Sequence, residues 1–149
     1  MALTVDCTSG VGSNARWDGV SKLYVRKAEV DVGGTLIVAA GTKTSSDVYQ
    51  ALDIPANTYV LGAWFVVTEA EATNVTATFA LGDGSNTAGY VAAATCAVVD
   101  IPHCSGGTDV YNAYAGKFYT SADTIDLLVA TAAFTNVVVD VYALCCDLE

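Results

Sequence analysis

The chain has 149 residues, of which 53% are hydrophobic and 15% charged, and its formal net charge is −10 at pH 7. This length fits one domain with a sizeable core, and so apolar a composition excludes a disordered tail. The negative charge argues against nucleic acid as a partner, because it would repel a phosphate backbone. A small monomer with so little charge would expose much apolar surface, so we expect the chain to associate.

The charge is divided unevenly along the chain. The first 43 residues carry five basic and four acidic residues, a net charge of +1, whereas the remainder carries one basic and twelve acidic residues, a net charge of −11. An N-terminal third that holds most of the positive charge is suited to docking against an acidic partner. The alternative is that these basic residues simply decorate one solvated strand.

Neither a secretory signal nor a membrane span is expected. The first ten residues lack a basic region and reach Asp6 before any apolar run develops. Residues 127–139 are uncharged, but they are too few and too polar to span a bilayer. We therefore expect a soluble chain that is made in the cytoplasm and has no membrane partner.

Residues 1–19 are rich in Gly, Ser, Thr and Asn and predict an irregular N-terminal arm. Its bulky groups are Arg16 and Trp17, which are side chains of the kind that dominates interfaces. Together with Lys22 and Arg26 in the following segment, they are our predicted partner contacts. The alternative is that the arm packs back over its own domain, with Trp17 capping the core.

Alternating apolar residues predict strands over residues 20–30, 35–40 and 48–54. Pro55 and Asn57 then mark a turn. Residues 59–68 give the strongest strand signal, because both parities are apolar. One parity holds Tyr59, Leu61, Ala63, Phe65 and Val67, and the other holds Val60, Gly62, Trp64, Val66 and Thr68. Such a strand is expected to be covered on both sides, either by its own core or by another subunit.

The second half predicts further short strands. Residues 74–81 alternate between polar and apolar side chains, with Val75, Ala77, Phe79 and Leu81 expected inside. Residues 82–86 (GDGSN) predict a turn, and residues 89–99 fit a short helical turn followed by a strand. Strands are also predicted over residues 111–119, 124–131 and 136–146.

Eight or nine short strands without a long helix indicate an all-β fold. We predict an antiparallel β-sandwich, with the jelly-roll as the leading form, in a single domain over residues 20–149.

The sequence offers little material for catalysis or for a metal site. Its five cysteines have no recognised spacing and are Cys7, Cys96, Cys104, Cys145 and Cys146. An odd number in a chain without a secretory signal indicates reduced thiols, and one of the last two is expected to fill core space. A zinc site made from Cys96, His103, Cys104 and a terminal cysteine is disfavoured, because paired, closely spaced ligands are missing.

Other chemical interpretations are also weak. His103 and Cys104 are adjacent, so they are poorly placed to act on one substrate atom. Asp83 is a single carboxylate between glycines, which suits a tight turn better than a calcium loop. Glu69 and Glu71 are interpreted as solvated turn residues rather than a glycosidase pair. We therefore predict that the protein is not an enzyme and uses no cofactor or metal.

Three segments carry a resemblance to a known family. They are residues 53–61 (DIPANTYVL), residues 80–85 (ALGDGS) with Gly89 and Tyr90, and residues 121–127 (SADTIDL) before a last Val-rich strand. Over residues 48–148 the chain resembles small virion proteins of tailed bacteriophages. The resemblance implies a non-enzymatic β-sandwich that belongs to the capsid shell or its accessories and is localised in the virion, after assembly in the host cytoplasm.

Two non-catalytic functions are compatible with these observations. The first is a capsid cement or decoration protein that clamps major capsid subunits as a symmetric oligomer, with a homotrimer preferred. The second is a head fibre, a tail adaptor or a receptor- or glycan-binding knob. Its support is a polar and aromatic group made of Tyr111, Tyr114 and Tyr119 with Asn112 and Asp109, although strand propensity explains the tyrosines equally well.

Overall fold

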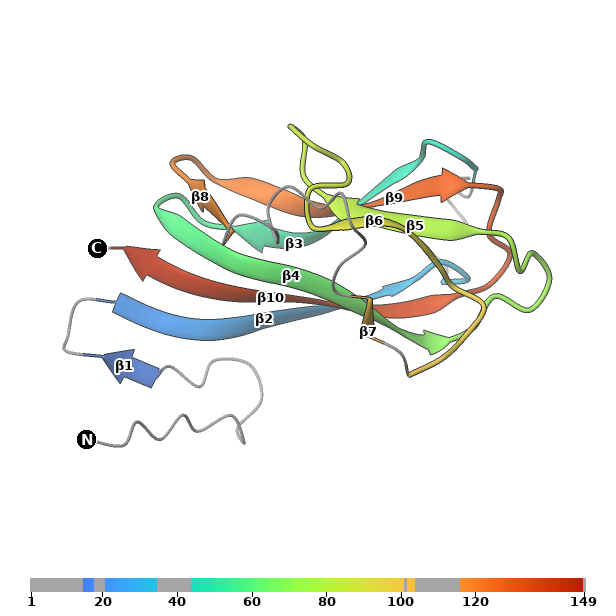
Figure 1. Ribbon diagram of the computed structural model, residues 1–149, viewed down its shortest axis with the longest axis horizontal. Coiled ribbons are helices and arrows are strands. Elements are labelled where there is room, and N and C mark those ends of the chain that lie inside the picture. Colours follow the sequence, from blue (N-terminus) through green and yellow to red (C-terminus); the bar gives the residue numbers. More distant parts are fainter. Residues whose placement is uncertain (1–14, 18–20, 35–43, 101, 104–115, 149) are drawn as a thin grey trace.

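The structure is a computed structural model that describes residues 15–17, 21–34, 44–100, 102–103 and 116–148, with the side chains of residues 15–17, 21 and 22 left aside. Two antiparallel sheets pack face to face, which confirms the predicted β-sandwich (Figure 1). Within these residues no helix is long and apolar enough to cross a membrane.

The larger sheet has six strands and the smaller sheet has four. The larger sheet follows the order β1 (Ala15–Trp17), β2 (Ser21–Asp31), β10 (Val138–Leu148), β4 (Thr58–Glu69) and β7 (Pro102–His103), and β8 (Lys117–Tyr119) also pairs with β4. The smaller sheet follows the order β3 (Val48–Ile54), β9 (Asp123–Thr131), β5 (Thr78–Gly82) and β6 (Val91–Thr95). From β2 to β5 the chain changes sheet at every connection, so sequence neighbours face each other across the core.

The core lies between the two sheets and is built around aromatic rings. Phe79 of β5 lies 4.2 Å from the ring of Phe134, and 6.2 Å from the rings of Tyr49 and Phe65. Phe65 and Phe79 are fully buried. Burial of an aromatic side chain of this size contributes about 1.5–3 kcal/mol to stability, so this cluster holds the two sheets together.

β4 departs from the simple alternation that its sequence suggests. Its pairing with β10 shifts register between Leu144 and Cys145 of β10, where Leu61 of β4 is passed over. Because of this bulge, Val60 and Ala63 are both buried, although the sequence pattern placed them on opposite faces. The prediction of two strict parities is therefore wrong across the bulge.

The turns around β4 and β5 follow from local chemistry. Asn57 adopts a left-handed φ of 60° between β3 and β4, and its carbonyl accepts the backbone N–H of Leu148 at 3.0 Å. After β5, a Cβ on Gly82 would collide with the carbonyl oxygen of Asn86, so the close turn requires glycine. The predicted turns at these two places are confirmed.

Several predicted boundaries need correction. β5 begins only at Thr78, and Val75 is 61% exposed rather than inside. The open prediction for residues 89–99 resolves as strand β6 without a helical turn. In the expected arm, Ala15–Trp17 form β1 and pair with β2, so these three residues are not irregular. The predicted strand over residues 35–40 and most of that over 111–119 lie outside the described residues.

Candidate interaction surface

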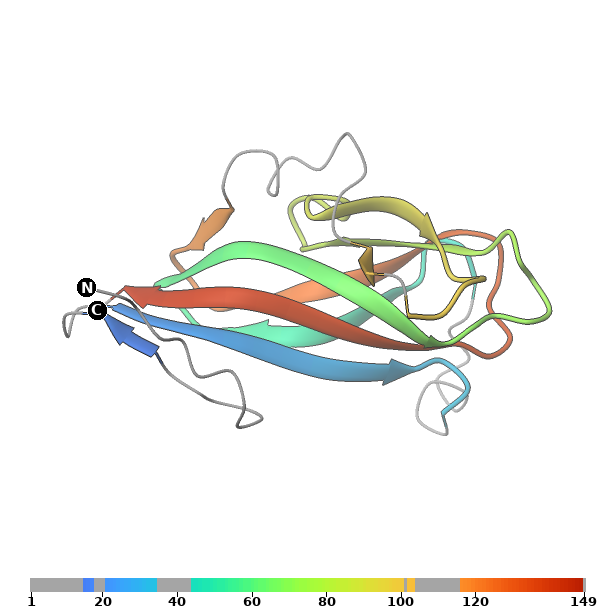
Figure 2. The same cartoon turned by 60° about the horizontal axis from the view of Figure 1, so that its bottom comes forward.

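The larger sheet turns one side toward the core and the other side away from it. Along β10, Val139, Val141, Ala143 and Cys145 are fully buried, and the residues between them face outward. We call the apolar part of this outward side the outer face. It comprises Leu23, Val25 and Lys27 of β2, Tyr142, Leu144 and Cys146 of β10, Tyr59, Leu61, Trp64 and Val66 of β4, and Phe118 of β8. No described strand lies over it (Figure 2).

Two aromatic pairs organise the outer face. Trp64 of β4 lies opposite Tyr142 of β10, with ring centroids 5.5 Å apart and planes 8° from parallel. Tyr59 of β4 stacks in the same way on Phe118 of β8, with centroids 6.5 Å apart. Cross-strand aromatic pairs stabilise a sheet, and they also hold the rings rigid. Rigid aromatic groups are suited to bind a partner, because little side-chain entropy is lost on contact.

Large apolar side chains remain exposed between and beside these pairs. Val25 is 43% exposed, Leu61 is 41% exposed and Phe118 is 40% exposed. Single exposed apolar residues are ordinary, but here they share one side of one sheet with four aromatic rings. A contiguous apolar patch of this kind is typical of a protein–protein contact.

One charged side chain lies within the outer face, on its β2 side. The ammonium of Lys27 lies 5.7 Å from the ring centroid of Tyr142 and forms an ion pair with Asp140 at 2.8 Å. Hydrogen bonding to Asp140 raises the pKa of Lys27, so the group stays charged. The acidic residues lie toward one end, where Asp31 and Glu69 flank Val138 in the register. Glu29 and Asp140 stand opposite each other next to this end, so the outward side of the larger sheet is apolar in its middle and acidic beyond the outer face.

The predicted partner contacts lie on the first two strands. Arg16 and Trp17 are in β1, where Arg16 stands opposite Lys22 of β2 in the antiparallel register. Arg26 points inward from β2, and its guanidinium donates a hydrogen bond to the carbonyl oxygen of Asp53 on β3. The structure thus brings Arg16, Trp17 and Lys22 together along the backbone and places Arg26 at the edge between the sheets.

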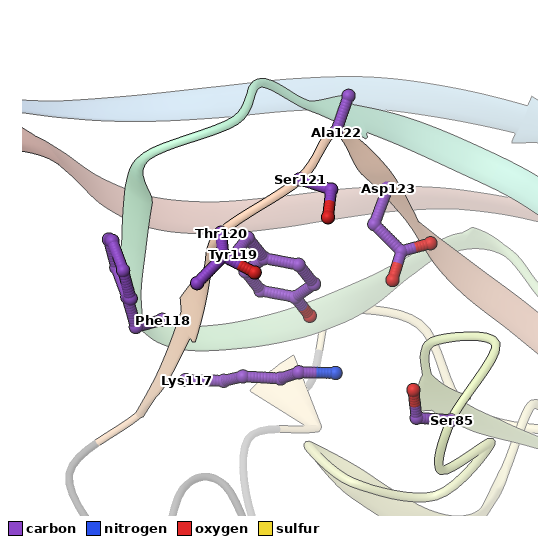
Figure 3. Close-up of a pocket in the computed structure, with 8 residues that line it drawn as sticks. All are labelled: Ser85, Lys117, Phe118, Tyr119, Thr120, Ser121, Ala122 and Asp123. Carbon is purple, nitrogen blue, oxygen red and sulfur yellow. The ribbon is translucent and has the colours of Figure 1, made fainter.

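A hollow of about 240 Å³ lies between the turn after β5 and the turn before β9 (Figure 3). Figure 3 shows Lys117 extending toward the turn that carries Ser85, with Ser121 and Asp123 on the opposite wall. The lining is polar and open, and its wall is fixed by a buried carboxylate, Asp83. This part of the surface is therefore a rigid edge of the sandwich.

Asp83 collects four hydrogen bonds at that edge. Its Oδ2 accepts the Lys117 ammonium at 2.5 Å and the Tyr119 hydroxyl at 2.8 Å, and its Oδ1 accepts the backbone N–H groups of Ser85 and Asn86. Burial alone would raise the pKa of Asp83, but these hydrogen bonds lower it below the ordinary value. The carboxylate fastens the turn after β5 to β8 in addition to shaping the turn.

Tyr119 belongs to this buried network rather than to a sugar site. It is 3% exposed, and its hydroxyl also lies 3.0 Å from the hydroxyl of Tyr90. Burial, with the neighbouring Tyr90 and Asp83, raises the pKa of Tyr119. Tyr119 therefore lends no support to the glycan-binding alternative, and Tyr111 and Tyr114 lie outside the described residues.

Glu71 was expected to be a solvated turn residue. The expectation is wrong, because its side chain is buried and only 2% exposed. Its Oε1 accepts the backbone N–H groups of Thr73 and Asn74 at 2.9 and 3.1 Å, and its Oε2 accepts those of Thr135 and Asn136 at 2.6 and 3.0 Å. Burial would raise the pKa of Glu71, but these four bonds lower it. The carboxylate joins the β4–β5 connection to the β9–β10 connection. The first residues of the strand expected at 74–81 form a turn instead, in which the N–H of Ala77 donates to the carbonyl of Asn74 at 2.9 Å.

The thiols and the histidine occupy structural positions. Cys96 and Cys145 are buried free thiols, and burial raises the pKa of each to about 12. Cys145 fills core space, which confirms the prediction for one of the two terminal cysteines. The ring of His103 packs 4.9 Å from that of Phe65, and burial lowers its pKa. Cys7 and Cys104 lie outside the described residues.

The sequence predicts the strand at residues 59–68, which carries part of the outer face. Most residues of the outer face lie on other strands and were not predicted to belong to it. Trp64 was identified as apolar, whereas its stacking on Tyr142 depends on the register between β4 and β10. One feature of the sequence indicated that Tyr142 faces outward. It lies between Val141 and Ala143 in the last strand, and side chains alternate between the two sides of a strand, so burial of Val141 and Ala143 turns Tyr142 to the other side. Lys27 had no signal of its own, because its place beside Tyr142 depends on pairing across two strands.

Comparison with protein-family models and with curated proteins gives no match. Several solved structures share the fold. In the capsid asymmetric unit of cyanophage Pam1, one chain superposes with a TM-score of 0.63 at 18% identity, over 100% of both chains. A chain in the capsid of Ralstonia phage GP4 gives a TM-score of 0.62 at 11% identity, over 94% of both chains. A chain in the acidic stable capsid of Helicobacter pylori bacteriophage KHP30 gives 0.51 at 15% identity, over 84% of this chain and 91% of that one. The chain therefore has the fold of a chain found in phage capsids.

Proposed function

We propose that this protein is a non-enzymatic component of a bacteriophage virion, a cement or decoration protein that stabilises the head by binding major capsid subunits. The observation that carries its assembly from like subunits is the outer face, where four aromatic side chains and several exposed aliphatic side chains share one side of one sheet. The shared fold with chains of three phage capsids supports the same conclusion.

The strand order supports the jelly-roll form of the sandwich. A jelly-roll has eight strands in two sheets, arranged as two Greek keys. Here β2, β10, β4 and the short β7 and β8 form one sheet against β3, β9, β5 and β6 in the other. This order places β2 beside β10, so the start of β2 and the end of β10 lie together at one end of the sandwich (Figure 1).

Within the virion, the outer face is the contact between like subunits, in a homo-oligomer that we take to be a trimer. Burial against another copy removes the apolar side chains of β4, β10 and β8 from water, and it requires no charged partner in the apolar middle of the patch. Arg16, Trp17, Lys22 and Arg26 are the proposed contacts with the acidic or polar surface of the shell. They form the one part of the chain in which basic residues gather.

A receptor- or glycan-binding knob is the weaker alternative, since Tyr119 is withdrawn into the core. The two functions are separated by mixing the purified protein with emptied heads and, separately, with host cells. We expect saturable binding to heads and none to cells. Binding to cells alone would replace the proposal with the knob.

The role of the arm is tested by deleting residues 1–13 and, separately, by changing Trp17→Ala. If the arm anchors the protein, head binding is lost while the melting temperature is unchanged. A melting temperature lowered by several degrees with binding intact would instead show that the arm packs on its own domain.

A further inference from the structure

Over most of its length, β2 is an edge strand of the larger sheet. Only its first three residues, Ser21, Lys22 and Leu23, pair with β1. Residues 24–31 pair with β10 on one side, and on the other side no described strand pairs with them. Figure 2 shows β1 beside only the beginning of β2. An open strand edge presents backbone N–H and C=O groups that another strand can bind.

This open edge has a defined length. At one end it is closed by β1, whose Ala15 stands opposite Leu23. At the other end a turn follows β2, in which the N–H of Gly34 binds the carbonyl of Asp31 at 3.0 Å. A strand that pairs here must therefore fit between β1 and this turn.

We propose that two copies of the chain pair antiparallel along this edge, about a two-fold axis at Ala28, so that their larger sheets become continuous. In that arrangement Lys27 of each copy stands opposite Glu29 of the other, and Val25 stands opposite Asp31. The outermost pair is Tyr24 with Val32 of the other copy. The second copy turns away after its Val32, before it would meet β1 of the first copy. The open part of β2 is therefore as long as the strand that pairs with it.

The charges on β2 select this register. Lys27 and Glu29 are both exposed and alternate with the half-buried Arg26 and Ala28, so they lie on the same side of the sheet. An axis at Lys27 or at Glu29 would place that residue against its own copy, and an axis at Val30 would place Glu29 against Asp31. Like charges directly opposite are destabilising, whereas opposite charges contribute favourably. The axis at Ala28 gives two opposite-charge pairs and no like-charge pair.

Lys27 is available for this contact in the single chain. Its side chain is 47% exposed, although its ammonium already pairs with Asp140. An ammonium has three donors, so a second carboxylate can join the first. The competing interpretation is that the charges of β2 protect an open edge against association, as on many edge strands. That interpretation predicts no pairing between copies.

The inference rests on the self-association in the proposed function, but it uses an edge that is distinct from the apolar middle of the outer face. Each edge contact is small and is therefore expected to be weak in isolation. On a shell that already holds many copies in place, such contacts are strengthened by the high local concentration. The edge would thus link neighbouring oligomers while the outer face holds each oligomer together.

The test uses an equal mixture of normal and heavy-isotope protein, treated with a carbodiimide that joins an amine directly to a carboxylate. We expect a cross-linked peptide that joins Lys27 of one isotope to Glu29 of the other. Glu29→Lys should reduce this pairing about tenfold, measured by sedimentation, and Lys27→Glu should reduce it to a similar extent. The double variant Lys27→Glu with Glu29→Lys should restore it to within about threefold.

Glu69→Lys is the matched control, since it makes the same charge change on β4 of the same sheet and should leave the pairing unchanged. Melting curves show that each variant is folded. Absence of the mixed-isotope cross-link in the unaltered protein, or a folded double variant that fails to restore pairing, would overturn the inference. Head binding is measured separately, so its failure would count against the proposed function and not against the edge contact.

Discussion

Phe65 and Trp64 are neighbours in β4, yet their side chains lie on opposite sides of the sheet. Phe65 is fully buried against Phe79 of the smaller sheet, whereas Trp64 stays half-exposed and stacks on Tyr142 within its own sheet. Both positions are equally apolar in the sequence. The difference shows that a second apolar face on a strand, when the fold has no layer left to cover it, is a surface for another chain. Substitutions on the two faces are therefore expected to differ in their effect on stability and on association.

The largest effect is expected when the inner face is changed. Phe65→Ala should lower the free energy of unfolding by about 3–5 kcal/mol, because it removes buried ring contacts and leaves a cavity. Trp64→Ala at the next position should cost only about 0.5–1.5 kcal/mol, the contribution of an aromatic pair beyond its buried area. Denaturant titration of both variants in dilute samples, in which association is suppressed, measures the difference. Equal losses would show that the two faces are buried alike.

A second large effect is expected at the polar edge that closes the inner face. Asp83→Ala should lower the free energy of unfolding by about 3 kcal/mol, because it leaves the Lys117 ammonium and the Tyr119 hydroxyl without their shared acceptor. Asp123→Ala, on the opposite wall of the same hollow, is the matched control and should cost less than about 1 kcal/mol. Urea midpoints for the two variants compare them. If Asp83→Ala lowers the free energy of unfolding no more than Asp123→Ala does, the Asp83 carboxylate does not fasten the turn after β5 to β8.

A smaller and pH-dependent effect is expected for Glu71. Its pKa is lowered in the folded state, so its contribution is present above the pKa of the unfolded chain, about 4.3, and is lost as the pH falls through the folded value. Glu71→Gln should cost about 1–3 kcal/mol at neutral pH and much less in acid. Thermal melts between neutral pH and about pH 3 measure this. The exposed Glu69→Gln is the control, and a pH-independent loss at Glu71 would contradict the assignment.

The smallest effect is expected on the outer face itself. Lys27→Ala removes an ion pair and a cation–π contact that are partly solvated, so the free energy of unfolding of the single chain should change by less than about 1 kcal/mol. Melting of a dilute sample, in which association is suppressed, gives this value. A loss of several kcal/mol would mean that Lys27 supports the fold rather than the surface.

Local pattern was sufficient for the strands that the core requires. The strands at residues 48–54, 124–131 and 136–146 were predicted within two residues, because each has one strongly apolar side. The pattern failed where a long-range contact decides the backbone. Glu71 accepts amides 64 and 65 residues further along the chain as well as those of Thr73 and Asn74, and the start of the expected strand at residues 74–81 forms a turn instead. No local signal distinguishes it from the exposed Glu69 two residues earlier.

The candidate site was predictable only in outline. Two apolar parities in residues 59–68 indicated a second surface, but its members come from four strands and depend on register. The bulge opposite Leu144 and Cys145 also moved Val60 and Ala63 to the same side. The predicted contacts Arg16, Trp17 and Lys22 rested on residue type alone, and type does not reveal which surface a side chain joins.

In the proposed function, the outer face joins copies of the chain. The most direct measurement is sedimentation at micromolar concentration of three proteins: the unaltered chain, Trp64→Asp and the control Val75→Asp, which places the same charge on an exposed loop residue outside the outer face. We predict a multiple of 15.3 kDa for the unaltered chain and the control, and loss of this oligomer in a folded Trp64→Asp variant, which retains at most the weak pairing along the β2 edge. A monomeric unaltered chain, or a Trp64→Asp variant that keeps the oligomer of the unaltered chain, would contradict this prediction.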